Sequence, residues 1–464
     1  MPKLSEFERY MSDLCEVLGH ADRHGSLVDY SRGLMLPIER KSVEPLAAHM
    51  DPWRVRAKHQ SLHHFVAKSQ WSDEAVLGRV RDWVVPTLGL EGGCYWIVDD
   101  TGFPKKGSCS VVVARQYCGQ LGKQDNCQIA VSLSLASPRG SVPIKWQLYL
   151  PKAWAEDRPR RAKAGVPAEV EFSTKPQIAL SQIKAAKEEG VAVGVVLADA
   201  GYGNETAFRE ELRRLGLVYC VGIQSVTSVW APGTHPLPPK SRKKTERPAK
   251  LLRRGRGHAP MKASVLAEQL PPSAWQNITW REGTNTELSS RFAAVRVRAA
   301  HHDYWRATLR EEQWLLIEWP EEEAEPTHYW LSTLSADMPL DELVAIAKMR
   351  WRIERDYQEL KQEFGLSHYE GRGWRGFHHH ATLCIAAYGF LLSQRLKQGG
   401  RKKNSARSKA PRLPEAYTPR GGRSDAAPRS RFNPNLAISH RTRDRKATRP
   451  LSVLRNREPM FVTQ

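Results

Sequence analysis

The sequence predicts a mixed α/β fold, because helical and strand-like patterns follow one another along its 464 residues. Residues 1–88 have the apolar spacing of amphipathic helices. Residues 92–149 have the pattern of short strands, and residues 175–222 change between the two patterns. A chain of this length is sufficient for two or three domains with hydrophobic cores.

The first 88 residues predict a helical domain. Phe7, Tyr10, Met11 and Leu14 are three, one and three positions apart, which places them on one face of a helix. Ser72 precedes two acidic residues and an apolar run, so we expect it to be the N-cap of another helix. Basic residues recur through this region. We therefore expect a domain that binds DNA, with dimerisation or packing as the alternative.

The middle of the chain predicts a sheet core. Apolar runs separated by glycine-containing turns predict strands at 95–100, 110–116, 126–135 and 144–150. A helix at 175–189, a strand at 191–198, a helix at 205–215 and a strand at 218–222 follow. The run at 191–198 is apolar almost throughout, which is typical of a strand buried on both faces. A strand meander followed by alternating helices and strands is the order expected of an RNase H-like α/β core.

Residues 225–336 interrupt this core with a predicted β-rich insertion, whose strands are expected at 275–281, 290–299, 313–318 and 327–332. Helices are predicted again at 341–364 and 379–396. In the first of these, Ile353, Tyr357, Leu360 and Phe364 form an apolar stripe. The predicted domains are a helical domain at 1–88, a core at 89–224 and 337–396, the insertion at 225–336 and a tail at 397–464.

The net charge of +21 is concentrated at one end of the chain. Residues 397–464 contain 18 Lys/Arg against 4 Asp/Glu, and their Gly, Pro, Ser, Arg and Lys content predicts a disordered basic tail. Residues 236–256 predict an exposed basic loop that includes Arg242, Lys243 and Lys244. A polyanion is the natural partner of both segments. A tail that serves only solubility is the alternative.

The remaining composition points to the cytoplasm. The seven cysteines contain no C-x-x-C pair, which disfavours a disulfide framework or structural zinc and fits a reducing compartment. The N-terminus has no apolar segment of the signal-peptide kind. No uninterrupted apolar run reaches about 18 residues, so we expect no membrane span.

Three acidic residues stand where metal-binding carboxylates are expected. Asp100 and Asp199 each end an apolar, strand-like run, and Glu354 lies in the helical pattern at 341–364. Carboxylates that converge from separate elements can hold two Mg²⁺ ions about 3.5–4 Å apart, which activate an attacking oxygen and stabilise the leaving one. Each aspartate taken alone is more often a turn former or helix cap.

The helix around Glu354 carries a more specific pattern. Arg350, Glu354 and Lys361 fall within roughly 40° on one face, at about 100° per residue. A carboxylate flanked by cations suits a helix that faces metal and phosphate. A salt-bridged surface is the alternative.

These motifs resemble those of DDE transposases from bacterial insertion sequences. The helix is similar to that family's R-x₃-E-x₆-K signature, although the Tyr that usually precedes the Arg by three positions is Ala347 here. Residues 99–107 (DDTGFPKKG) and 197–203 (LADAGYG) resemble the motifs of the first and second catalytic acids. Residues 114–119 and 376–380 resemble further motifs, and the likeness covers about residues 25–395.

The resemblance implies that Asp100, Asp199 and Glu354 are both the catalytic residues and the ligands of two Mg²⁺ ions, with Mn²⁺ as a substitute. Asp99 competes with Asp100 for the first position. The Asp-Thr pairing of the family motif favours Asp100, and Asp99 would then face the opposite side of the strand.

The same resemblance implies a DNA transposase that cleaves transposon ends and joins the 3′-OH to target DNA by two-metal-ion phosphoryl transfer. Its partners would be double-stranded DNA, both ends and target, and it would act as a homodimer on paired ends, near the bacterial nucleoid. The candidate DNA contacts are Arg350, Lys361, Lys105, Lys106, Arg242, Lys243 and Lys244. The alternatives are an RNase H-like endonuclease without strand transfer and an inactive DNA-binding relic of a transposase.

Overall fold

The computed structural model describes residues 4–240, 250–282 and 287–402, all of which fall in the first of two units of the chain. The predicted loop residues Arg242, Lys243 and Lys244 lie outside the described residues, as does the predicted tail from residue 403 onward. The predicted domain boundaries stay predictions.

Residues 6–88 form a series of helices joined by short loops, as predicted. They are α1 (Glu6–Glu16), α2 (Arg23–Met35), α3 (Val43–Met50), α4 (Val55–His63), a π-helix (His64–Lys68) and α5 (Asp73–Leu88). The Ser72 side chain accepts a hydrogen bond from the backbone N–H of Ala75, which confirms it as the N-cap of α5. Tyr10, Met11 and Leu14 are fully buried, so the predicted apolar stripe of α1 faces the core.

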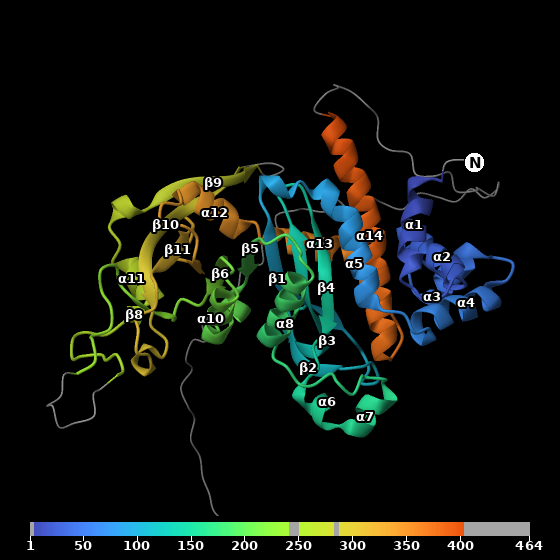
Figure 1. Ribbon diagram of the computed structural model, residues 1–464, viewed down its shortest axis with the longest axis horizontal. Helices are drawn as coiled ribbons and strands as arrows, with labels where there is room; N and C mark the ends of the chain where they lie inside the picture. Colours follow the sequence, from blue (N-terminus) through green and yellow to red (C-terminus); the bar gives the residue numbers. More distant parts are fainter. Residues whose placement is uncertain (1–3, 241–249, 283–286, 403–464) are drawn as a thin grey trace, which may run out of the picture. The chain divides into compact units, whose positions relative to one another are not determined.

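A mixed sheet of 12 strands forms the centre of the unit (Figure 1). Strand β1 (Tyr95–Pro104) lies antiparallel to β3 (Lys123–Ala136) and parallel to β5 (Val195–Ala198). Strand β4 (Ser141–Leu148) pairs with β3, and β6 (Tyr219–Ile223) continues the sheet parallel to β5. The predicted mixed α/β class is therefore confirmed.

Two strands begin later than predicted. Strand β2 covers Ala114–Cys118 rather than 110–116, because Val112 has a φ of 54° and the N–H of Val111 bonds to the carbonyl of Arg372 instead of a strand. Strand β5 begins at Val195 rather than 191. A Cβ on Gly194 would lie 2.6 Å from the carbonyl carbon of Cys94, so the chain passes closely against the start of β1 before pairing begins.

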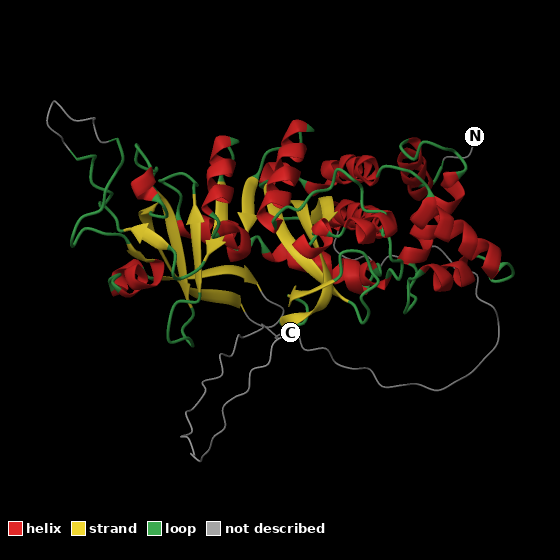
Figure 2. Ribbon diagram, turned by 90° about the horizontal axis from the view of Figure 1, so that it is seen from below, coloured by secondary structure: helices red, strands yellow, loops and turns green. Residues whose placement is uncertain are grey.

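The strands of the predicted insertion continue the core sheet. They are β7 (Ser228–Trp230), β8 (Met261–Lys262), β9 (Gln276–Glu282), β10 (Glu287–Ala299), β11 (Gln313–Trp319) and β12 (His328–Ser332), with the short helix α11 (Ala263–Glu268). Strand β12 pairs with β6, and β11 and β10 follow it in order. Figure 2 shows the strands, in yellow, with helices, in red, around them.

The helix predicted at 341–364 is two helices. These are α12 (Leu340–Lys348) and α13 (Trp351–Gln362), with a break at 349–350. Ile353, Tyr357, Leu360 and Phe364 are buried, which confirms the predicted stripe. The remaining helices are α6 (Lys152–Glu156), α7 (Arg158–Lys163), α8 (Lys175–Glu188), α9 (Ala200–Gly203), α10 (Thr206–Arg214) and α14 (Trp374–Lys402). None of the helices in the described ranges is long and apolar enough to cross a bilayer.

Helix α14 begins earlier and ends later than predicted, and three consecutive histidines fix it in the core. His378 accepts a hydrogen bond from the backbone N–H of Leu148 in β4, at 3.2 Å. His379 contacts the carbonyls of Val66 and Trp71, and His380 contacts Tyr30. Burial lowers the pKa of His379 and His380 to about 4. These side chains therefore join the N-terminal helices to the sheet.

A buried carboxyl group ties α13 to its surroundings. Oδ1 of Asp356 accepts hydrogen bonds from Ser141 in β4 at 2.7 Å and from Tyr388 in α14 at 2.8 Å, while Oδ2 has no partner. Burial raises the pKa of Asp356 to about 7, against the lowering effect of these two hydrogen bonds. The neutral acid is therefore favoured at acidic pH in the folded protein.

Replacing Asp356 with Asn should flatten the pH dependence of stability. The folded pKa lies above the unfolded one, so this carboxyl group favours the folded state below about pH 4 and loses that effect as pH rises towards about 7. The loss has a slope of up to about 1.4 kcal/mol per pH unit. Asn cannot ionise, so the variant should gain stability relative to wild type from pH 5 to pH 8 in urea denaturation. Parallel curves for the two proteins would show that Asp356 stays ionised throughout.

Candidate active site

The predicted acids come from two neighbouring strands inside the sheet and from helix α13. Asp99 and Asp100 are in the second half of β1, Asp199 directly follows β5, and Glu354 is in the first turn of α13. Strand β5 pairs with β1 only up to Ile97, so the segment of β1 that carries the two aspartates projects beyond its parallel neighbour. Neighbouring side chains of a strand point to opposite faces, and Asp99 and Asp100 accordingly have different partners.

Arg350 joins Asp99 to Glu354. Its Nη1 donates to Oδ2 of Asp99 at 2.8 Å, and its Nη2 donates to Oε1 of Glu354 at 2.6 Å. Arg350 occupies the break between α12 and α13, so the guanidinium reaches the strand on one side and the helix on the other. The structure therefore brings Asp99, Arg350 and Glu354 together.

Asp100, on the face of β1 opposite to Asp99, contacts Lys175 and Tyr202. Its Oδ2 accepts from the ammonium of Lys175 at 2.9 Å and from the hydroxyl of Tyr202 at 3.2 Å. Lys175 is the first residue of α8, and nothing in the sequence pattern indicates its pairing with a residue 75 positions earlier. Asp100 is thus neutralised by a cation of its own.

Asp199 caps the short helix α9, since its Oδ1 accepts from the backbone N–H of Gly201 at 2.9 Å. It also lines a cavity of about 510 Å³ together with Arg350 and Glu354. The insertion supplies another wall through Tyr329 and Trp330. The space beside these acids is therefore enclosed partly by the core and partly by the insertion strands.

The acids interact electrostatically. Burial raises the pKa of Asp99 to about 7; Arg350 opposes this shift, while Asp199 and Asp100 add to it. Burial lowers the pKa of Arg350, but Asp99, Glu354 and Asp199 together raise it well above its ordinary range. The site is a group of like charges held by one guanidinium, which is an arrangement that favours binding of a further cation.

The donor set suits a hard divalent cation, because it consists of carboxylate oxygens. Within the described part of the chain, however, no group of three or more His, Cys, Asp or Glu side chains is close enough to hold a metal ion. Arg350 occupies the position between Asp99 and Glu354. The residues therefore fit Mg²⁺ chemically, and Arg350 would have to release at least one carboxylate.

Two of the predicted lysines, Lys361 and Lys105, have internal partners. Lys361 donates to the carbonyl of Gly102 at 2.8 Å and to Gln120 at 3.0 Å, and burial lowers its pKa to about 8. Lys105 donates to the carbonyl of Tyr369 at 3.1 Å. With Lys106 it lines a separate cavity of about 780 Å³.

The sequence patterns did not reveal an ion pair that supports the helix carrying Glu354. Lys348 at the end of α12 donates to both oxygens of Glu318 in β11, at 2.7 and 2.6 Å. Its ammonium lies over the rings of Trp280, Phe292 and Trp330, at 4.4 to 5.5 Å. This ion pair fixes the insertion to the helix break at Arg350. A lone Lys in a helical pattern gives no signal for it.

Comparison with known proteins agrees with the motifs. The sequence profile of the family described as DDE superfamily endonuclease matches residues 13–287. The match includes Asp99, Asp100 and Asp199 and ends before Glu354. A probable transposase for the insertion sequence element IS701 from Microchaete diplosiphon is 34% identical over 167 residues, which are 36% of this chain and 41% of that protein.

A cryo-EM structure of the piggyBac transposase synaptic complex with hairpin DNA aligns with 88% of this chain and 69% of that chain. The sequence identity is 10% and the TM-score is 0.40, and a likeness this distant says nothing of function.

Replacing Arg350 with Ala should destabilise the metal-free protein more at pH 8 than at pH 5.5. Without the guanidinium, ionised Asp99 has no cation, whereas at pH 5.5 Asp99 is protonated in both proteins. We expect a loss of about 2 kcal/mol at pH 8, below the 3–5 kcal/mol of a fully buried pair because Arg350 is partly exposed. Chemical denaturation of both proteins in the presence of EDTA measures this loss in the free energy of unfolding.

The control is Arg355→Ala on the same helix, which removes an exposed pair with Glu359 and should cost less than about 1 kcal/mol at either pH. Equal losses for Arg350→Ala at pH 5.5 and pH 8 would contradict the role given to Asp99.

Proposed function

Because the chain belongs to the DDE superfamily of endonucleases, we propose that it is a DNA transposase that cleaves transposon ends and joins the resulting 3′-OH to target DNA. The observation that carries the proposal is the convergence of Asp99, Asp199 and Glu354 around Arg350, beside a cavity. The likeness to an insertion-sequence transposase supports strand transfer as well as cleavage.

Asp199, Glu354 and one aspartate of β1 are the proposed ligands of two Mg²⁺ ions, for which Mn²⁺ can substitute. When bound, the ions would supply Lewis-acid stabilisation of charge at the scissile phosphate. The family motif favoured Asp100 as the first ligand. The contact of Asp99 with Arg350 supports Asp99 instead, because Asp99 is on the side of Glu354 and Asp100 is already paired with Lys175.

We propose that Arg350 changes partners when DNA binds. Its guanidinium now satisfies two carboxylates. A fork of this kind also fits a phosphate group, so a released Arg350 would hold the DNA backbone next to the acids. Lys105 and Lys106 line another cavity on the surface and are proposed to contact the same backbone further along.

The proposed partner is double-stranded DNA, at both the transposon ends and the target, and a homodimer on paired ends is proposed for the active assembly in the bacterial cytoplasm. The net charge of +21 supports a polyanionic partner. An endonuclease that cuts without joining is the competing function, supported by the family's description alone.

Replacing Glu354 with Gln should abolish cutting and joining while DNA binding persists. The amide keeps the shape of the side chain but is a poor Mg²⁺ ligand. We expect the rate to fall by more than about 100-fold, since even the partners that orient metal ligands contribute 10–100-fold. The assay uses duplex DNA carrying the sequences that flank the gene.

The control is Glu363→Gln, an exposed residue just after α13, which should leave both reactions unchanged. Cutting by wild type without joining would identify the competing endonuclease. Binding without either reaction would identify an inactive relic. Normal cutting by Glu354→Gln would place the chemistry elsewhere.

A further inference from the structure

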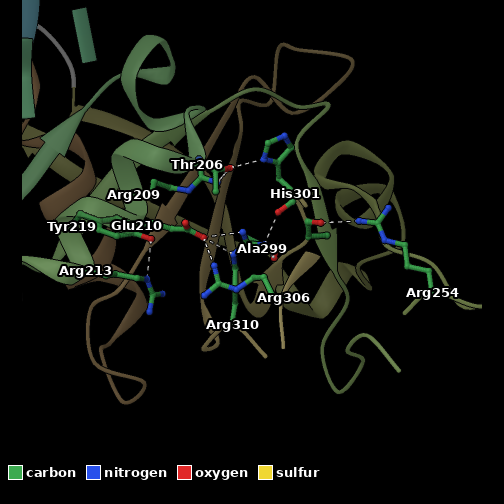
Figure 3. Close-up of polar contacts among 11 residues, drawn as sticks. Thr206, Arg209, Glu210, Arg213, Tyr219, Arg254, Ala299, His301, Arg306 and Arg310 are labelled. Atoms are coloured by element: carbon green, nitrogen blue, oxygen red, sulfur yellow. Dashed lines mark hydrogen bonds and ion pairs between the residues drawn. The ribbon is translucent and has the colours of Figure 1, made fainter. Parts of the chain in front are cut away.

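A second charged cavity lies at the other end of β6. Its volume is about 450 Å³, and it is lined by α10, by the start of β6 and by the segment between β10 and β11. Every cationic side chain that lines it is an arginine: Arg209, Arg213, Arg306 and Arg310. Figure 3 shows Arg306 and Arg310 reaching Glu210, while Arg213 contacts Tyr219.

The segment that carries Arg306 and Arg310 is held rigidly. The carboxylate of Asp303, which is buried, accepts from the indole N–H of Trp230 at 2.6 Å and from Arg254 at 3.0 Å. Nη1 of Arg310 donates to the carbonyls of Ala299 and His301, which fixes the plane of its guanidinium. The arginines are therefore presented in a set arrangement rather than as mobile surface side chains.

The cavity has more positive than negative charge. Glu210 pairs with both Arg306 and Arg310, at 2.7 and 2.8 Å, and Glu311 pairs with Arg213 at 2.5 Å. Four arginines therefore face two glutamates. Burial lowers the pKa of Arg209, and the nearby Arg310 and Arg213 lower it further, so the arginines repel one another. Nε of Arg306 is buried without a hydrogen-bond acceptor. An added anion in the cavity would relieve the repulsion between the arginines.

The residue types favour phosphate as this anion. A guanidinium offers a planar fork of donors that matches phosphate oxygens, whereas an ammonium is a point charge. Exposed aromatic side chains, Tyr304 and Trp305, precede Arg306 directly, and such rings stack on nucleotides next to a backbone site. Tyr304 and Trp305 do not line the cavity itself, but arginine forks on the same segment as exposed rings are typical of a nucleic-acid surface rather than of a site for a small inorganic anion.

The position of the cavity separates it from the candidate active site. Gly222 and Ile223 at the end of β6 line the cavity that contains Asp199, whereas Tyr219 at its start lines the arginine cavity. Five residues at about 3.3 Å each put the two ends of β6 roughly 15 Å apart. One phosphate group cannot occupy both places.

We propose that the arginine cavity formed by Arg209, Arg213, Arg306 and Arg310 binds the phosphodiester backbone of a DNA segment that is separate from the segment at the candidate active site. The proposal rests on the proposed function, because it requires a protein that binds DNA. It adds a second DNA contact, so that one protein chain holds two stretches of DNA near the opposite ends of strand β6.

The test compares Arg213→Gln with Arg214→Gln, adjacent residues of α10 that lose the same charge. Arg214 points away from the cavity and pairs with Glu211 on the surface. Binding of a labelled duplex is measured over a range of salt concentrations. Arg213→Gln should weaken binding and reduce the slope of log K against log salt by about 1, since one phosphate contact is lost. Arg214→Gln should change the slope by much less.

A gain-of-affinity variant excludes misfolding as the cause. Glu311 is 83% exposed and competes for Arg213, so Glu311→Gln should tighten DNA binding several-fold. Equal slopes for Arg213→Gln and Arg214→Gln, with no gain for Glu311→Gln, would overturn the proposal. So would ATP raising the melting temperature of wild type but not of Arg213→Gln while the DNA slope stays the same, because the cavity would then hold a free nucleotide.

Cleavage is followed on the same duplex. A protein that binds DNA as predicted but never cuts it would contradict the proposed function and still support the arginine cavity as a DNA contact.

Discussion

The Arg350 guanidinium forms the contact on which the candidate site depends. Its two hydrogen bonds connect a strand end, through Asp99, to the helix that carries Glu354. The contact is made at the break between α12 and α13, where Arg350 is the N-cap residue. Lys348, paired with Glu318 under three aromatic rings, fixes that break against the insertion. The strands of the predicted insertion thereby contribute to the position of the helix that carries Glu354.

The same guanidinium also stabilises acidic groups that lie close together. A buried carboxylate that lacks a partner is costly, and Arg350 reduces that cost for Asp99, whose side chain is mostly buried, whereas Glu354 is exposed. In the proposed function, these carboxylates would hold divalent metal and a released Arg350 would contact phosphate. Metal binding and DNA binding would then depend on a single side chain.

Most of the fold could be predicted from local patterns, and the two misplaced strand starts have local causes. Helix N-caps such as Ser72 and the stripe from Ile353 to Phe364 follow from spacing alone. The late start of β2 depends on the positive φ of Val112, and that of β5 on the close passage of Gly194 along Cys94. Pairing of β12 with β6 joins segments about 110 residues apart, and no periodicity encodes such a pairing.

The site was predictable as a set of residue types but not as a set of contacts. Motifs pointed to the acids and Arg350, and the structure places Asp99, Arg350 and Glu354 in contact. The choice between Asp100, which the motif favours, and Asp99, which we propose, depends on which face of the strand meets a distant helix, and a motif does not reveal this. The cation beside Asp100, Lys175, and the arginine cavity around Glu210 both come from elements that meet only in the folded chain.

The most direct test of the central claim is the amount of Mn²⁺ bound by wild type, Asp99→Asn and Asp100→Asn in the presence of duplex DNA, followed by electron paramagnetic resonance. If Asp99 shares a metal centre with Asp199 and Glu354, Asp99→Asn loses the bound ion while Asp100→Asn keeps it. Loss of the ion in Asp100→Asn with normal binding in Asp99→Asn would contradict the account and move the centre to the face of Lys175 and Tyr202.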